Sequence, residues 1–286
     1  MSKFERQNLR FTSEDDISPL ISMLKGNIPI KTIIDIGCAD GTFSLTCLLI
    51  NPNFKILNID AQTTYEENLN YISQKLGGYH RITGLSSFSG KMKFGLLPDH
   101  GQSMPYWFGN SGKKSDEEID CTTLDLLMEE LDLPTPYFIR MDIENSEFHV
   151  LQGATATLTK TAGIILEQHT ILNGDAGNFL DRCNFLASRG FTLFDILRRS
   201  YHPTQPAYLM CFFPVFLNSK YVNIPEVYEK LSTKRLLTMS WLDGQPLLNF
   251  KDARKEVRNT IAKNMFYTWY KPFYEYGIIH GDPHLG

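Results

Sequence analysis

Glycines and carboxylates gather in one short segment, with the types and spacing that ligand binding needs. The segment Asp35-Ile-Gly37-Cys-Ala-Asp40-Gly41 lies between a β-branched apolar run and an apolar helical run. In open α/β sheets, ligands bind beside such strand-to-helix turns, where glycine lets the backbone approach and a helix N-terminus supplies N–H donors. The cofactor-binding residues predicted in this segment are Asp35, Gly37, Asp40 and Gly41.

The spacing of this segment distinguishes between nucleotide ligands. A dinucleotide fingerprint reads GxGxxG, but Ala39 and Thr42 replace its second and third glycines, which leaves DxGxxxG. Asp60 ends the next apolar run and is predicted to accept hydrogen bonds from both ribose hydroxyls of an adenosine ligand. This glycine-rich motif resembles that of S-adenosylmethionine (SAM) methyltransferases. The alternative is a tight turn without a ligand, in which Asp40 serves the turn.

The elements that must position these residues alternate between strand and helix. Apolar β-branched runs predict strands at 31–36, 54–59, 81–85, 91–96, 137–141, 163–166, 191–196 and 207–216. Helical spacing predicts helices at 13–24, 43–50, 65–76, 122–131, 146–158 and 178–187. The alternation predicts an α/β fold, a mostly parallel sheet with helices on both faces, and an antiparallel hairpin at one edge.

Residues 98–119 have no periodicity and are rich in turn-forming residues. We interpret them as a long loop, which in a compact domain is often functional. Tyr106 and Trp107 would suit a lid over an acceptor, and the alternative is an ordinary surface loop.

A second set of four sequence motifs follows in order along the chain. They read TTLD (122–125), FIRMDIENSE (138–147), LQGA (151–154) and IILEQH (164–169). They resemble the FkbM family of SAM-dependent methyltransferases, whose pattern runs roughly TLD, KIDVEGxE, LxGA and ILVEVH. With the first motif, the resemblance covers about residues 13–215 and implies a Rossmann-like class I methyltransferase sheet. Asn145 stands where the family has glycine, and asparagine tolerates a left-handed backbone; Arg140 replaces the usual lysine.

The resemblance implies SAM as cofactor and O-methylation of a hydroxyl on a sugar, glycan or other small natural product. The acceptor oxygen must lie about 3–3.5 Å from the methyl carbon, and a base near it would remove its proton. The predicted catalytic residues lie at or just beyond strand ends; they are Asp142, Glu144, Glu167 and His169. Asp142 or His169 is the candidate base, and Asp142 is alternatively a ligand of the SAM amino group.

Each of these residues also has a purely structural interpretation. Glu144 and Glu147 suit the first turn of a helix, where they complement its dipole. His169 suits a buried hydrogen-bonded position. A metal held by Asp142, Glu144 and His169 is a further alternative, but no strong metal-ligand spacing is present, so we predict no metal site.

Residues 217–286 do not continue this pattern. Residues 224–244 predict a strand pair, 252–276 a long helix, and the chain reaches the segment His280-Gly-Asp282-Pro-His-Leu-Gly286. This stretch resembles the middle of a UbiB-like atypical kinase, including the start of its HGDPHxGN loop. Other parts that phosphoryl transfer needs are absent, so we expect a truncated kinase-like fragment without kinase activity. The predicted domains are 1–215 and 216–286, with self-association possible through the helix.

Composition and charge set further limits. The net charge of −4 does not favour nucleic-acid binding. The part after residue 215 is basic and the part before it acidic, which indicates two joined sequences. The five cysteines form no CxxC pair, the N-terminus has no apolar signal segment, and the longest apolar run is about half of the ~20 residues that a membrane helix needs. We expect a cytoplasmic protein; alternative functions are a non-catalytic fusion and a kinase-type accessory protein of quinone metabolism.

Overall fold

Strand β1 (Thr32–Ile36) is the centre of the larger sheet, and all five of its residues are buried. Successive side chains of a strand point to opposite faces, so Ile33 packs in one apolar layer and Ile34 and Ile36 in the other. The structure is a computed structural model. It describes residues 14–25, 28–96, 103–105, 116–143, 146–170, 178–202, 205–221, 228–231, 247–262 and 265.

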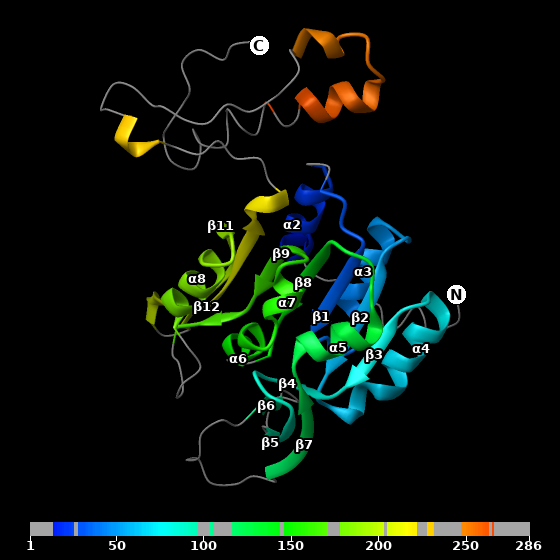
Figure 1. Ribbon diagram of the computed structural model, residues 1–286, viewed down its shortest axis with the longest axis vertical. Coiled ribbons are helices and arrows are strands. Elements are labelled where there is room, and N and C mark those ends of the chain that lie inside the picture. The colour runs from blue at the N-terminus through cyan, green and yellow to red at the C-terminus, as the bar shows by residue number, and fades with distance from the viewer. Residues whose placement is uncertain are drawn as a thin grey trace. The chain divides into compact units, whose positions relative to one another are not determined.

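The larger sheet is parallel around β1 and antiparallel at one end (Figure 1). Its strand order is β10-β12-β9-β8-β1-β2-β3, with β11 paired to β12. The chain runs from β1 outward to β2 and β3 on one side, and β8 and β9 lie on the other. The strand order therefore reverses at β1, between β2 and β8. The bounds are β2 (Lys55–Asp60), β3 (Tyr79–Ile82), β8 (Tyr137–Met141), β9 (Thr161–Leu166), β10 (Gln168–His169), β11 (Phe191–His202) and β12 (Gln205–Asn218).

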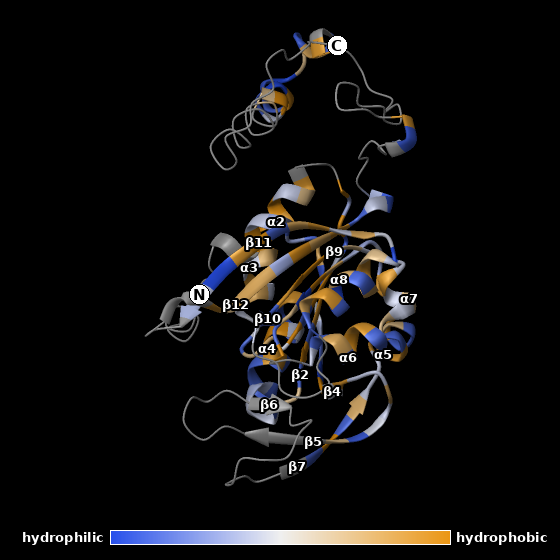
Figure 2. Cartoon of the chain, turned by 90° about the vertical axis from the view of Figure 1, so that its left-hand side faces the viewer, coloured by the Kyte–Doolittle hydropathy of each residue, from blue (hydrophilic) through white to orange (hydrophobic). Residues whose placement is uncertain are grey.

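Helices cover both faces of this sheet, as the alternation predicts (Figures 1 and 2). One face is covered by α2 (Glu14–Lys25) and α3 (Thr42–Ile50), whose buried residues pack with Ile33. The other is covered by α5 (Leu124–Leu131), α6 (Glu147–Gln152), α7 (Thr155–Leu158) and α8 (Phe179–Ala187), which pack with Ile34. Helix α4 (Glu66–Leu76) follows the short helix η1 (Thr63–Tyr65) and packs beside Cys38. The expected α/β class is confirmed.

The antiparallel hairpin at the sheet edge is also confirmed. β11 and β12 pair antiparallel from Phe191↔Asn218 onward, and β12 pairs antiparallel with β9 through Val215↔Ile165. Strand β12 is therefore an inner strand, whose apolar residues Val215 and Phe216 are buried. Helix η2 (Ser219–Tyr221) follows it.

Three local expectations need correction. The strand expected at 81–85 is divided between β3 and β4 (Gly84–Leu85), which belong to different sheets. The loop expected at 98–119 contains β6 (Ser103–Pro105) and the start of β7 (Asp116–Thr122), which form a second sheet in the order β4-β7-β5-β6 with β5 (Gly90–Leu96). The helix expected at 146–158 is broken at Gly153, where a side chain would overlap the backbone carbonyl of Ser86.

The chain divides into two compact units, Met1–Val222 and Asn223–Gly286. In the second unit the described residues form η3 (Glu229–Leu231), η4 (Leu247–Phe250) and a helical segment over 255–262, and residue 265 is also helical. This helix falls within the helix expected at 252–276. Most of the expected strand pair and the whole of the segment 280–286 lie outside the described residues. Where the chain is described, no helix has the length and apolar character to cross a bilayer.

Candidate functional site

The turn between β1 and α3 lies at the carboxyl end of β1, where the strand order reverses. Ligands of open α/β sheets bind at such a position. Gly37, Ala39 and Gly41 all have positive φ, at 74°, 48° and 79°. A side chain at Gly37 would overlap the carbonyl oxygen of Asp142 at the end of β8. Gly37 is therefore required here, because it lets the two strand ends approach each other.

Asp60, at the end of β2, holds this turn in place. Its Oδ2 accepts a hydrogen bond from the Ala39 N–H at 2.8 Å, and its Oδ1 accepts one from the Gln62 N–H at 2.9 Å. Burial raises the pKa of the Asp60 carboxyl, although these N–H groups lower it. Asp60 is buried, with 7% of its surface exposed. Asp60 thus links the turn between β1 and α3 to the end of β2.

Asp40 stabilises the start of α3. Its Oδ1 accepts hydrogen bonds from the Thr42 N–H at 3.1 Å and from the Thr42 hydroxyl at 2.7 Å. Its carbonyl oxygen accepts a hydrogen bond from Asn68 on α4. These contacts are those of a turn residue, which is the alternative that the sequence left open for Asp40.

Arg140 connects two predicted site residues. Its Nη1 donates to Asp35 Oδ1 at 2.9 Å and its Nη2 to Asp142 Oδ2 at 2.6 Å. Asp35 is fully buried, so its side chain has no surface that a ligand can contact directly. Burial raises the pKa of Asp35, and Arg140 opposes this shift. Asp35 therefore supports the site through Arg140, whereas a quarter of the Asp142 side chain is exposed.

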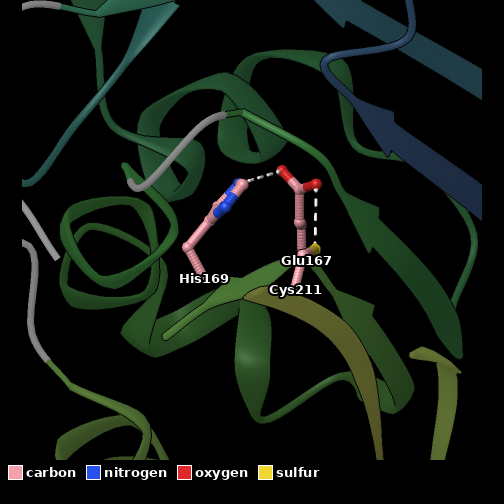
Figure 3. Close-up of side chains that lie close together, drawn as sticks. All are labelled: Glu167, His169 and Cys211. Atoms are coloured by element: carbon pink, nitrogen blue, oxygen red, sulfur yellow. Dashed lines mark hydrogen bonds and ion pairs between the residues drawn. The ribbon is translucent and has the colours of Figure 1, made fainter. Parts of the chain in front are cut away.

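Glu167, His169 and Cys211 lie together beyond β9 (Figure 3). The His169 Nε2 is 3.1 Å from Glu167 Oε2, and the Cys211 thiol donates to Glu167 Oε1 at 3.3 Å. Their ligand atoms all lie within 4.8 Å of one another. Glu167 N also donates to the Met141 carbonyl, one residue before Asp142, at 2.9 Å. This cluster is thus beside the end of β8, and its donor types can hold a cation.

A buried ion pair lies under this cluster. The Arg182 Nη2 donates to Glu147 Oε2 at 3.0 Å, and both side chains are fully buried. Arg182 Nη1 donates to Gln168 Oε1 at 2.6 Å, and Glu147 Oε1 accepts from the Ile143 N–H at 3.2 Å. Burial raises the pKa of Glu147 to about 7, although Arg182 lowers it. Arg182 therefore connects α8, α6 and the segment that carries His169.

The structure brings most predicted residues to one edge of the sheet. Along that edge, Asp60 ends β2, Gly37 follows β1, Asp142 follows β8, and His169 lies beyond β9. Glu144, Tyr106 and Trp107 lie outside the described residues. Sequence reasoning missed Cys211 and Arg182, which are far from their partners along the chain. Arg140 was noticed only as a replacement for lysine, and its pairing with two acidic strand residues was missed.

Comparison with known proteins finds a matching family model in each part of the chain. The family model described as "Methyltransferase FkbM domain" matches residues 35–193, which is more than half of the chain. The model described as "ABC1 atypical kinase-like domain" matches residues 212–286. The chain is also 33% identical over 70 residues to "Atypical kinase COQ8B, mitochondrial" from Danio rerio, covering 24% of this chain and 10% of that protein. The chain thus spans about a tenth of the length of this kinase.

Solved methyltransferase structures are similar at low identity. The N-terminal domain of EvdMO1 with SAH bound is 12% identical, with a TM-score of 0.41, over 72% of this chain and 82% of that one. A precorrin-6y C5,15-methyltransferase from Geobacter metallireducens is 11% identical, with a TM-score of 0.37, over 74% of this chain and 93% of that one. By the family match across residues 35–193, the chain belongs to the methyltransferase FkbM domain family, and its last part resembles the ABC1 atypical kinase-like domain.

Proposed function

We propose that residues 1–215 form a SAM-dependent methyltransferase that methylates a hydroxyl group of a sugar, glycan or other small natural product. The observation that carries this proposal is the convergence of Gly37, Asp60 and Asp142 where the strand order reverses. Binding at this position is the rule in open α/β sheets. The family match supports methyl transfer as the reaction class.

The side chains at this edge fit the chemical groups of SAM. A carboxylate accepts hydrogen bonds from hydroxyl groups and pairs with an ammonium group. Asp60 is assigned to the ribose hydroxyls, because it follows the strand next to β1. Asp142 is assigned to the amino group, because it lies against Gly37 and Arg140 holds it in place through one oxygen. When bound, SAM supplies the sulfonium methyl group.

His169 is the proposed base, and Glu167 is its positioning residue. The Glu167 carboxylate lies 3.1 Å from His169 Nε2 and so orients the ring. The His169 side chain is 23% exposed, but its Nε2 is buried against Glu167, so we assign proton uptake to Nδ1. An oriented histidine can take the proton of a hydroxyl as its oxygen attacks the methyl carbon. Asp142 is less suited to this role, because Arg140 pairs with its carboxylate. Glu144, outside the described residues, stays a predicted catalytic residue.

The proposal is tested by calorimetric titration of the full chain with SAM and S-adenosylhomocysteine. We expect binding, and Asp60→Ala should weaken it at least about tenfold, equivalent to ~1.4 kcal/mol. Glu129→Ala, on the exposed side of α5, is the matched control and should bind as the wild type does. No binding by the wild type would exclude the methyltransferase function and favour a non-catalytic fusion.

The base is tested by screening hydroxyl-bearing sugars and natural products for release of S-adenosylhomocysteine. With an accepted substrate, His169→Gln should lower kcat by about 10²–10⁴ and leave SAM affinity unchanged. A kcat equal to that of the wild type would assign the base elsewhere, with Asp142 as the next candidate.

For residues 216–286 we propose a kinase-like fragment without phosphoryl-transfer activity. The match of residues 212–286 to the ABC1 atypical kinase-like domain supports the kinase-like assignment. ATP titration of the full chain should give no binding, and binding would favour the kinase-type function. Self-association through the helix expected at 252–276 and a cytoplasmic location remain proposals. Size-exclusion chromatography and cell fractionation, respectively, would test them.

A further inference from the structure

The pairing of two strands brings Glu167, His169 and Cys211 onto one face of the sheet edge. In the antiparallel pair β10–β12, His169 lies directly opposite Cys211. Directly opposed residues have Cβ atoms about 4.5–5.5 Å apart and project on the same side. Glu167 is two residues before His169, so in an extended segment it points to that side too. Figure 3 shows the Glu167 carboxylate between the imidazole and the thiol.

Two contacts in the cluster, each to a different oxygen of the Glu167 carboxylate, have lengths close to those between neighbouring ligands of a small cation. With Zn–S near 2.3 Å and Zn–N and Zn–O near 2.0–2.2 Å, tetrahedral ligands lie about 3.4–3.6 Å from one another. The Nε2–Oε2 and Sγ–Oε1 distances are 3.1 and 3.3 Å, and the whole set lies within 4.8 Å. Small side-chain movements would therefore place all three atoms around one ion.

We propose that Glu167, His169 and Cys211 bind a thiophilic divalent cation, with Zn²⁺ as the ion that best matches a thiol, an imidazole and a carboxylate. Mg²⁺ and Ca²⁺ are not the preferred ions for a site that contains the Cys211 thiol, because those ions select oxygen donors. On binding, the Cys211 thiol loses its proton to solvent as the sulfur–metal bond forms. The thiolate and carboxylate then balance the charge of the ion. Three protein ligands leave a fourth position open to water or a substrate oxygen.

Neighbouring residues hold this donor set in place. Arg182 donates to the backbone carbonyl of Glu167 at 3.4 Å and to the side chain of Gln168 at 2.6 Å. Arg182 is fully buried and is itself paired with Glu147. Glu167 and Cys211 are largely buried, so the site is partly shielded from solvent. Such supporting contacts orient metal ligands and contribute to affinity.

The proposed site uses the same His169 ring as the proposed base. A cation bound to Nε2 leaves the ring proton on Nδ1, which then cannot accept another proton. A bound cation and a proton-accepting His169 therefore exclude each other, and Zn²⁺ should inhibit methyl transfer without displacing SAM. This consequence rests on the proposed function, whereas cation binding itself does not. SAM titration tests the proposed function, and metal titration tests cation binding, so the two proposals can fail separately.

The test is a titration of the metal-free full chain with Co²⁺ and Zn²⁺. Co²⁺ should produce a thiolate-to-cobalt charge-transfer band that saturates at one ion per chain and disappears when Zn²⁺ displaces it. Cys211→Ser should remove the band, and His169→Gln should weaken binding at least tenfold. Cys183→Ser is the matched control, since this partly exposed cysteine is outside the cluster; its band should equal that of the wild type.

A second measurement does not depend on variants. X-ray absorption at the zinc edge of the wild-type chain with one equivalent of Zn²⁺ should give one sulfur ligand at about 2.3 Å and nitrogen or oxygen ligands otherwise. The proposal would be overturned if the zinc had no sulfur ligand or had two or more. It would also be overturned if the cobalt band survived in folded Cys211→Ser. Absence of saturable binding by the wild type would do so as well.

Discussion

Gly37 and Asp142 are in backbone contact: any side chain at Gly37 would overlap the carbonyl oxygen of Asp142. Two motifs about a hundred residues apart in the sequence thus meet at the ends of adjacent parallel strands. The contact holds the glycine turn against the strand that carries Asp142 and Arg140. Its strength can be measured by substitution.

Gly37→Ala should destabilise the protein more than Gly77→Ala does. Both glycines have nearly the same φ, +74° and +72°, but a side chain at Gly77 meets no atom within 4 Å. Gly77→Ala should therefore cost only the left-handed backbone strain of about 1–2 kcal/mol. Overlap at Gly37 should add about 1–3 kcal/mol. Urea unfolding measures both values, and equal costs would contradict a tight Gly37–Asp142 contact.

Arg140→Met should be strongly destabilising, because it leaves the Asp35 carboxylate buried without its cation. Removing one partner of a buried ion pair costs about 3–5 kcal/mol. Arg81→Met is the matched control: Arg81 makes an equally short ion pair with Glu130 at 2.7 Å, but this pair is exposed and should contribute about 0–1 kcal/mol. Chemical denaturation gives both values.

The double variant Asp35→Asn with Arg140→Met separates the pair energy from other effects. If the two residues act together, the double variant should be less destabilised than the sum of the single variants by about 0.5–3 kcal/mol. Simple additivity would mean that the 2.9 Å contact between them contributes nothing measurable.

Glu147 should make stability fall as the pH rises. Its folded-state pKa is raised to about 7 from the ordinary value of 4.5, mainly by burial. Between these values the folded chain holds a proton that the unfolded chain has released, so each step up in pH favours unfolding. The loss should be on the order of a few kcal/mol between about pH 4.5 and 7 and should level off above it.

The pH effect is measured by denaturant unfolding at a series of pH values in wild type and Glu147→Gln. The variant cannot ionise, so its stability curve should lack this descending part, although it should also be less stable through weaker pairing with Arg182. Glu130→Gln changes an exposed carboxylate and is the control. Parallel curves for wild type and Glu147→Gln would contradict the raised pKa.

Residues 1–222 should fold and bind SAM without the rest of the chain. All of the described site lies in this unit, and β12 ends at Asn218 within it. A chain cut after residue 211 should fail to fold, because it loses the buried residues Val215 and Phe216 that pair with β9. Circular dichroism and SAM titration of the two truncations decide this. A folded 1–211 chain would mean that β12 is dispensable.

The centre of the larger sheet could be predicted because β1, β2, β8 and β9 are short and mostly apolar. The apolar run at 31–36 is followed by a glycine and has no helical spacing, so it predicts a strand. The structure has β1 there, over Thr32–Ile36. The second sheet could not be predicted in the same way. Strand β7 contains Asp116, Glu117, Glu118 and Asp120, and this polar run has the composition of a loop; its pairing with β5 depends on contacts between distant segments.

Site residues could be predicted where they lie at the ends of apolar strands. They could not be predicted where their position depends on how strands pair across the sheet. Asp60 and Asp142 follow buried runs, so their positions at one edge follow from the parallel sheet. Asp125 shows the limit. Its N–H donates to the Gly153 carbonyl at 3.0 Å and so joins the TLD and LQGA motifs, and its carboxylate accepts hydrogen bonds from the Ala156 and Thr157 N–H groups just after LQGA. The sequence could only place these motifs in order. Likewise, Cys211 reaches His169 only through the register of β10 and β12.

Strand β12 extends into the part of the chain that matches the ABC1 atypical kinase-like domain. The match to the ABC1 atypical kinase-like domain begins at residue 212, yet residues 212–218 are built into the sheet that β9 belongs to. Natural variation in these seven residues should therefore be restricted by the needs of the methyltransferase sheet. If the kinase-like piece has lost its original role, substitutions should accumulate from about residue 223 onward, and the change in evolutionary rate should fall after the strand rather than at the boundary of the family match.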